Sequence, residues 1–357
     1  MPKTPLNSAL TTLCHVQPVP AAYRLQEVLA FHQRDAAQLA ERITPTSHGL
    51  PRLHKGLDWE GQPAWMALEW EAAAPSTPPP TPPSAPFPVP LSEPRPASPA
   101  AGPLQVRAML HLPQAAQAHH PARWAATVRR MLGLAYAPAA FEAAHAHHPQ
   151  LGPLLRAQSG LHVPAAPTVW EALTWAITGQ QISVAAAVTL RRRLIQAAGT
   201  ALQPAGREGQ ALWTYPHAQQ VAQLGAQGLR AAGYSQSKTR ALLALAEQVA
   251  GGALPVDAWV QASDAGQLQA PDVDAAAQQL LAIPGIGPWT VHYTLLRGLG
   301  WPDGSLHGDV AVRKALARLL GVERVTEAQA RDWLAPFAPW RALVAAHLWA
   351  SLSAQAY

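Results

Sequence analysis

Three short runs near the N-terminus alternate apolar and polar residues with the period of two that is typical of β-strands. They cover residues 51–57, 64–70 and 104–112, and a glycine-containing turn joins the first two. Residues 21–40 instead have the spacing of a helix. The pattern predicts a small α/β domain in the first third of the chain.

From residue 113 onward, the apolar residues recur with helical spacing. Thr168 with Glu171 and Thr326 with Gln329 form capping-box patterns, and Ser183 is a typical N-cap residue. The predicted helices cover residues 168–178, 183–199, 224–228, 238–250, 275–283, 288–298, 309–320 and 339–351. We therefore expect a mainly helical body after the small domain.

Proline is concentrated in one segment, residues 75–103, which contains 13 of the 36 prolines of the chain. Such a segment cannot form the interior of a helix or a sheet. We predict that it is an exposed insert of the small domain. A passive loop insertion is favoured over a ligand for a proline-binding partner.

Composition and charge exclude several classes of protein. The single cysteine, Cys14, excludes an internal disulfide framework and sites built on several thiolates. The hydrophobic share of 49% excludes wholesale disorder. A net charge of +5 permits a nucleic-acid partner without requiring one.

The longest uncharged stretch, residues 172–190, contains a Gly-Gln-Gln break and does not have the pattern of a membrane span. The N-terminus lacks a clear signal peptide. We expect a soluble, cytoplasmic protein that does not enter a membrane. The histidine clusters around residues 119–120 and 145–148 lack metal-ligand spacing and predict a solvated surface.

Candidate chemistry is concentrated in residues 281–315, where a glycine turn joins two predicted helices and an aspartate opens a third. Gly285 and Gly287 flank the turn, and free amides at a helix N-terminus favour an anion such as a phosphate. An ordinary corner between two helices also needs glycine. Asp309 has the position of an N-cap residue.

These motifs, taken together, resemble the helix-hairpin-helix DNA glycosylases that have a Gly/Pro-rich loop and a downstream aspartate. Within that superfamily the chain looks most like the 3-methyladenine DNA glycosylase II type. The resemblance covers most of residues 104–357 and, more faintly, the N-terminal domain. It is carried by the order and spacing of residues 179–183, 284–287, Trp289 with Tyr293, Asp309, residues 339–341 and residues 347–349.

The resemblance implies a mainly α fold of two helical subdomains, preceded by a small α/β N-terminal domain with an antiparallel sheet. The expected domains are residues 1–112, interrupted by the insert 75–103; residues 113–168 with 302–357; and residues 169–301, with the hairpin motif at 276–298.

The implied function is a monofunctional glycosylase that flips alkylated bases of the 3-methyladenine and 7-methylguanine type out of duplex DNA. It would leave an abasic site in base-excision repair. A uracil, mismatch or other damaged-base glycosylase and a non-catalytic DNA-binding module are the alternatives. We expect a monomer, associated with the nucleoid in the cytoplasm.

By the same resemblance, Asp309 is the catalytic carboxylate, which stabilises the oxocarbenium-like transition state or assists the attacking water. Trp289, Tyr293 and Trp349 would line the base pocket and attract a cationic base, although aromatic core packing is the alternative for each. Trp289 occupies the slot of the Schiff-base lysine of lyase-type relatives, so no lyase activity is expected.

The resemblance also assigns the DNA contacts. Gln180, Gln181, Gly285, Gly287 and Arg313 would touch DNA, although a solvated helix face is as good an interpretation for Arg313. The wedge that fills the gap left by the flipped base is Gln181 or Ile182. No cofactor is required, but main-chain carbonyls of Leu281, Ile283 and Ile286 are expected to hold a structural Na⁺ or K⁺ ion.

Overall fold

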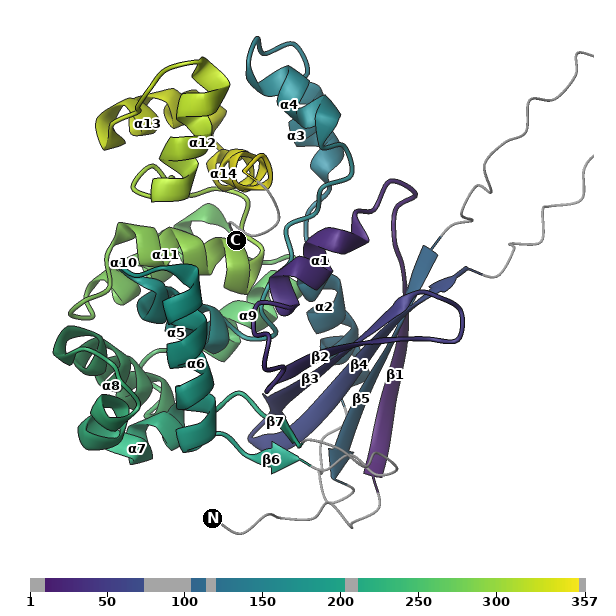
Figure 1. Cartoon of the computed structure of the whole chain (residues 1–357), viewed down its shortest axis with the longest axis vertical. Coiled ribbons are helices and arrows are strands. Elements are labelled where there is room, and N and C mark those ends of the chain that lie inside the picture. The colour runs from purple at the N-terminus through teal and green to yellow at the C-terminus, as the bar shows by residue number, and fades with distance from the viewer. Residues whose placement is uncertain (1–9, 74–103, 114–119, 203–210, 353–357) are drawn as a thin grey trace, which may run out of the picture.

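A five-stranded antiparallel sheet forms the N-terminal part of the molecule (Figure 1). The structure is a computed structural model that describes residues 10–73, 104–113, 120–202 and 211–352. The strands are β1 (Leu10–Pro18), β2 (Glu41–Pro45), β3 (Pro51–Trp59), β4 (Gln62–Ala72) and β5 (Leu104–Pro113), in the order β1-β5-β4-β3-β2. The register pairs Ala72 with Leu104, so the chain leaves and re-enters the sheet at one place. The proline-rich segment predicted as an insert lies outside the described residues.

Two helices, α1 (Leu25–His32) and α2 (Pro121–Met131), cover the face of the sheet that is turned toward the rest of the molecule (Figure 1). Trp124, Val128 and Met131 of α2 follow helical spacing and are buried against the strands. Side-chain packing therefore places α2 with the sheet, whereas the sequence grouped residues 113–168 with the C-terminal helices.

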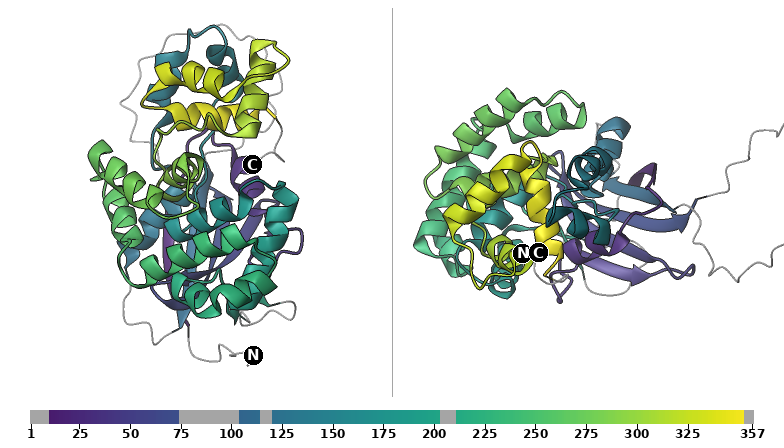
Figure 2. Two further views of the ribbon diagram at one scale, coloured as in Figure 1. Left: turned by 90° about the vertical axis from the view of Figure 1, so that its left-hand side faces the viewer. Right: turned by 90° about the horizontal axis from the view of Figure 1, so that it is seen from above.

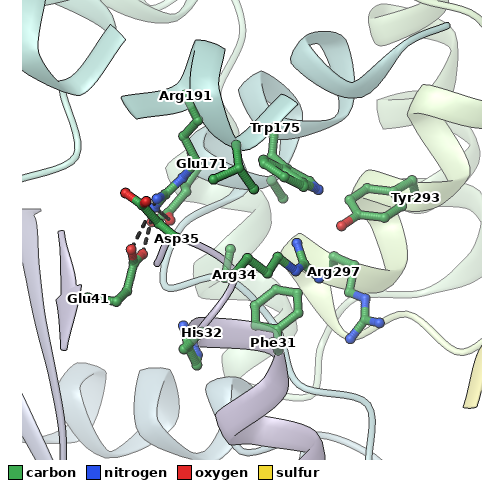
Figure 3. A pocket seen from close by; sticks show the side chains of 13 residues that line it. Phe31, His32, Arg34, Asp35, Glu41, Glu171, Trp175, Arg191, Tyr293 and Arg297 are labelled. Atoms are coloured by element: carbon green, nitrogen blue, oxygen red, sulfur yellow. Dashed lines mark hydrogen bonds and ion pairs between the residues drawn. The ribbon is translucent and has the colours of Figure 1, made fainter. Parts of the chain in front are cut away.

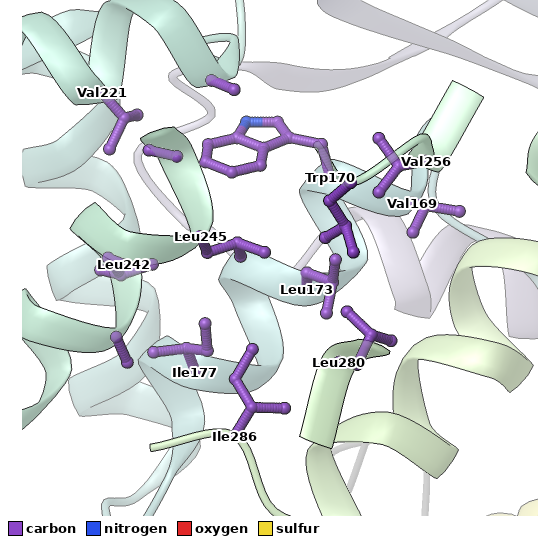
Figure 4. Close-up of a cluster of buried hydrophobic side chains, with 14 of the residues drawn as sticks. Val169, Trp170, Leu173, Ile177, Val221, Leu242, Leu245, Val256, Leu280 and Ile286 are labelled. Carbon is purple, nitrogen blue, oxygen red and sulfur yellow. The ribbon is translucent and has the colours of Figure 1, made fainter. Parts of the chain in front are cut away.

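The middle of the chain forms a helical body around a large apolar core (Figure 4). Trp170, Leu173 and Ile177 of α5 lie at its centre and contact side chains from the surrounding helices. The helices are α5 (Val169–Gly179), α6 (Val184–Ala198), α7 (Ala218–Ala231), α8 (Gln236–Ala250), α9 (Val256–Asp264) and α10 (Ala270–Leu281). A short hairpin of β6 (Ala201–Leu202) and β7 (Leu212–Trp213) contacts β3 beside Gly56.

A second helical body combines two segments that are far apart in the sequence (Figure 2). Phe141 and Leu151 share its core with Leu316 and Leu343. Its helices are α3 (Pro138–His145), α4 (Leu151–Ala157), α12 (Val310–Leu320), α13 (Glu327–Leu334), the 3-10 turn η2 (Ala335–Phe337) and α14 (Arg341–Ala350). Helix α11 (Pro288–Thr294) and the π-helical turn η1 (Leu295–Leu299) connect the two bodies.

The three predicted strands and the mainly α fold with a small antiparallel sheet are confirmed. The expected helix over residues 21–40 was too long, since α1 covers only Leu25–His32. The sequence also missed β1 and β2, which are the two edge strands of the sheet. An edge strand buries less of its surface, so its apolar pattern is weaker. Among the described helices, none is long and apolar enough to cross a lipid bilayer.

Candidate active site

Asp309 lies in the loop that follows η1 and is the N-cap residue of α12. Its backbone is extended, and its Oδ1 accepts a hydrogen bond of 2.9 Å from the amide of Val312. The side chain is partly buried, while the next residue, Val310, is 72% exposed. The carboxylate thus lies near the surface rather than inside the core.

Two tryptophan indoles from different helices also donate hydrogen bonds to this carboxylate. Trp289 of α11 donates from Nε1 to Oδ2 at 2.8 Å, and Trp349 of α14 donates from Nε1 to Oδ1 at 3.2 Å. Together with the cap, donors from three helices orient both oxygens. The sequence predicted both rings in a base pocket, and their hydrogen bonds to the aspartate were not predicted.

The loop that presents Asp309 is itself held from both sides. His292 of α11 donates from Nδ1 to the carbonyl of Ser305 at 2.8 Å; burial lowers the pKa of His292, and the neutral ring can still donate from Nδ1. Arg341, at the start of α14, binds Asp303 through Nε and Nη2 at 2.8 and 2.7 Å. The sequence offered no matched role for His292, because its contact is with a backbone carbonyl, which leaves no side-chain pattern in the sequence.

The aromatic residues form a continuous contact behind the carboxylate. Trp289 and Tyr293 stack with ring centroids 5.4 Å apart and an interplanar angle of 29°. The Tyr293 and Trp349 centroids are 6.2 Å apart. Tyr293 is buried and lies between the aspartate-binding rings and the cavity described next.

A cavity that is partly open to solvent lies where the N-terminal part meets the helical bodies (Figure 3). Phe31 and Arg34 reach it from α1 and the loop that follows, Trp175 from α5, and Tyr293 and Arg297 from α11 and η1. Of the three predicted pocket residues, Tyr293 lines this cavity, whereas Trp289 and Trp349 bind Asp309 beside it.

Guanidinium groups lie against the aromatic rings of the cavity. Arg34 is 4.3 Å from the ring centroid of Phe31 and 5.0 Å from that of Trp175. Arg297 is 4.8 Å from Phe31 and 5.5 Å from Trp349, and its Nη1 donates to the carbonyl of Pro164 at 2.7 Å. The sequence did not identify Phe31, Arg34, Trp175 or Arg297, because nothing local shows that α1 faces α5 and η1.

A buried cluster of charges closes the other end of the cavity. Lys55 contacts Glu41 and, at 2.7 Å, Glu171, while Arg191 binds Glu41 through two hydrogen bonds of 3.0 and 2.6 Å. Arg191 also reaches Glu171 at 2.9 Å. Burial alone raises the pKa of Glu41, but the charges of Arg191 and Lys55 outweigh this and hold it below its ordinary value.

The hairpin between α10 and α11 has the predicted glycine turn. Gly285 has a φ of +90°, and a Cβ there would lie 3.0 Å from the Cβ of Ala241, so both conformation and space favour glycine. No described atom lies within 4 Å of a Cβ placed on Gly287, which leaves its backbone open to a ligand. The side-chain amide of Gln180 donates to the carbonyl of Gly285 and the hydroxyl of Thr290, both at 2.9 Å.

Gln180 therefore ties the turn between α5 and α6 to the hairpin. The adjacent Gln181 is exposed and has a φ of +56°, which is uncommon for a residue other than glycine. Ile182 beside it is 37% exposed, so both candidates for the wedge stand at the surface. Arg313 is partly buried one turn into α12, and its Nε has no hydrogen-bond partner in the described ranges.

The three residues predicted to hold a monovalent cation surround the hairpin turn. Leu281 ends α10, and the carbonyl of Ile283 accepts a hydrogen bond of 3.1 Å from the amide of Ile286. This cation site stays a prediction. Over the residues that the structure describes, no three His, Cys, Asp or Glu side chains come together as a metal site.

Residues 174–336 match the model of the HhH-GPD superfamily base excision DNA repair protein. The chain therefore carries an HhH-GPD superfamily domain, whose matched range includes the hairpin, Trp289 and Asp309.

The chain is 32% identical over 199 residues to DNA-3-methyladenine glycosylase 2 of Escherichia coli, which covers 56% of this chain and 63% of that protein. It is 31% identical over 230 residues to the probable bifunctional transcriptional activator/DNA repair enzyme AlkA of Mycobacterium tuberculosis, which covers 64% of this chain and 42% of that protein. The chain thus spans less than two thirds of the length of these curated relatives.

A solved structure, the 3-methyladenine DNA-glycosylase from Archaeoglobus fulgidus, is similar over 93% of this chain and 94% of that one. The TM-score is 0.63 at 18% sequence identity, which establishes a common fold.

Proposed function

We propose that the chain is a DNA glycosylase that hydrolyses the N-glycosidic bond of alkylated bases in duplex DNA as a step of base-excision repair. The observation that carries the proposal is the carboxylate of Asp309, which three N–H donors orient. One donor, Trp289, stacks on Tyr293, which lines the cavity. The names of the similar proteins, 3-methyladenine DNA glycosylases, support the choice of alkylated bases.

The reaction requires that the target nucleotide leaves the base stack, because the glycosidic bond is not reachable inside the duplex. The carboxylate of Asp309 faces C1′ of the flipped nucleotide, stabilises the positive charge that develops there, and orients the attacking water. Trp289 and Trp349 keep both oxygens in place, so little reorganisation is needed in the transition state.

The enzyme is monofunctional in this proposal. A lyase step needs an amine that forms an imine with C1′. The expected slot holds Trp289, whose indole nitrogen is bound to the aspartate. The products are therefore a free base and an abasic site.

The protein acts as a monomer that contacts DNA through the hairpin and the turn before α6. The open backbone at Gly287 receives a phosphate, and Gln181 or Ile182 fills the gap in the duplex. A Na⁺ or K⁺ ion held by the carbonyls of Leu281, Ile283 and Ile286 would offset phosphate charge.

The test is base release from methylated duplex DNA by the wild type and by Asp309→Asn. We expect release of 3-methyladenine by the wild type and a loss of at least about a hundredfold in the variant, with DNA binding retained. Asp332→Asn, the same change at an exposed carboxylate of α13, serves as the control. Unchanged release in Asp309→Asn removes the aspartate from its role, and binding without release of any lesion favours a non-catalytic module.

A further inference from the structure

The carboxylates that line the cavity already have basic partners. Asp35 binds Arg192, and both Glu41 and Glu171 bind Lys55 and Arg191. These pairs place three acidic side chains against three basic ones. Arg34 also lines the cavity and is not part of these pairs.

Two hydrogen-bond donors of Arg34 are used by no described side chain or carbonyl. Its Nε and Nη2 are buried and have no hydrogen-bond partner among the described residues. The guanidinium lies between the rings of Phe31 and Trp175, and Figure 3 shows it extending across the cavity toward Tyr293 and Arg297. A buried donor without an acceptor is unfavourable, so this position favours a ligand that supplies an acceptor oxygen or nitrogen.

We propose that Arg34 is a specificity-determining residue that extends the substrate range of the site from alkylated bases to neutral bases with an oxo group, such as hypoxanthine and uracil. The inference rests on the proposed function of the site as a glycosylase. The positive charge of Arg34 disfavours a cationic alkylated base. The guanidinium of Arg34 also covers the ring faces of Phe31 and Trp175 that such a base would use. An oxo oxygen, by contrast, accepts a hydrogen bond from Nε or Nη2.

The charge of Arg34 also fits the chemistry of a neutral leaving group. When the C1′–N bond breaks, its electron pair stays on the base, and the negative charge spreads to the oxo oxygen. Donors of Arg34 stabilise that charge in the transition state. Water then supplies the oxygen that bonds to C1′, and one of its protons neutralises the base. A cationic base leaves as a neutral molecule and gains nothing from this contact.

The experiment compares two lesions under single-turnover conditions. Hypoxanthine is neutral and has an oxo group, whereas 3-methyladenine in DNA is cationic and has none. Arg34→Met keeps the length of the side chain but removes its charge and its donors. We expect the ratio of hypoxanthine to 3-methyladenine release to fall at least about tenfold in this variant. Arg34→Lys keeps the charge without the planar fork. We expect its release ratio to lie between those of the wild type and Arg34→Met.

Arg129→Met, the same change at an exposed arginine of α2, is the matched control, and thermal unfolding of every variant checks that the fold is kept. An unchanged ratio in Arg34→Met, or a wild type that releases 3-methyladenine but no hypoxanthine or uracil, overturns the inference alone. A wild type that releases no base from any duplex overturns the proposed function and this inference together.

Discussion

Asp309 combines a structural and a chemical position in one side chain. An N-cap aspartate ordinarily satisfies backbone amides at the start of its helix. Here the two indole nitrogens of Trp289 and Trp349 add hydrogen bonds to the same carboxylate. The geometry of the candidate site therefore depends on the packing of α11 and α14 as well as on α12.

The protonation of His347, a residue of α14, is coupled to the stability of the fold. It is buried, and its Nδ1 lies 2.7 Å from Oε1 of Gln158. Burial, with a smaller contribution from the charge of Arg24, lowers the pKa of His347 to about 3. Because the unfolded chain then binds the proton more readily, the stability from this residue is full above its unfolded pKa of about 6.5 and is lost as pH falls toward 3.

We expect the free energy of unfolding of the wild type to fall between pH 6.5 and pH 4, and this slope to decrease by up to one proton in His347→Asn. Urea denaturation at several pH values measures both slopes. His147→Asn, at an exposed position of the same body, controls for the loss of an imidazole. Equal slopes in His347→Asn and the wild type would show that this histidine does not resist protonation.

Among single residues, the sequence identified those whose role is indicated by neighbouring residues along the chain. Asp309 was found because a hairpin precedes it and a helix follows it. Arg34 and Phe31 were not found, since their partners Trp175 and Arg297 come from helices that only the folded chain brings near.

Among the elements, the turn between α5 and α6 contains one of the described non-glycine residues with a positive φ. Gln181 adopts a left-handed conformation with a φ of +56° at the exposed edge of this turn. A side chain other than glycine costs of order 1 kcal/mol in such a conformation, so a function has to explain why glutamine is present. The wedge role predicted for it supplies a reason.

We expect Gln181→Gly to stabilise the fold by about 1 kcal/mol and to lower base release from duplex DNA. Chemical denaturation and single-turnover release measure the two effects on the same preparation. Gln38→Gly relieves a similar φ of +51° away from this turn and should stabilise without a loss of release. Full activity of Gln181→Gly would transfer the wedge role to Ile182.

The helix after the hairpin shows how far element boundaries can be predicted. Its start at Pro288 follows from the sequence, but its last turn, η1, is π-helical. Side chains from other helices bind carbonyls of this turn, since Arg130 reaches Gly298 at 3.1 Å and Ser263 reaches Leu299 at 2.9 Å. Such tertiary contacts leave no local signal, and the wider turn carries Arg297, whose side chain lines the cavity.

In the whole molecule, the buried charge cluster joins the sheet to the helices. Lys55 of β3 and Glu41 of β2 meet Glu171 of α5 and Arg191 of α6. The predicted capping box at Thr168 is only half formed for this reason. The Thr168 side chain caps α5 as expected, while the Glu171 side chain turns to Lys55 and Arg191.

We expect Lys55→Met to destabilise the protein by about 3–5 kcal/mol, because it leaves two buried carboxylates with a single arginine. The double variant Lys55→Met with Glu171→Gln keeps the paired contact of Arg191 with Glu41 and should recover part of the loss. Urea denaturation of both variants measures the difference. A single variant as stable as the wild type would mean that the cluster does not join the two parts.

The sequence predicted the helical part of the molecule better than the way its parts meet. Capping residues, glycine turns and apolar spacing are local, and they identified most helices from α5 to α14. The cavity depends on where the loop after α1 lies against α5 and η1. Asp35 of this loop binds Arg192 of α6, a contact between residues far apart in the sequence.

The pairing of Ala72 with Leu104 across neighbouring strands has a consequence for how this protein can change. Because the chain departs and returns at adjacent positions, the fold requires only that the two ends of this connection lie side by side. The entropy of closing such a loop grows with the logarithm of its length, and each doubling costs only about 0.6 kcal/mol. Evolution can therefore lengthen, shorten or recode this connection almost freely, and a protein engineer can open new termini or graft a foreign domain there while the candidate site stays untouched.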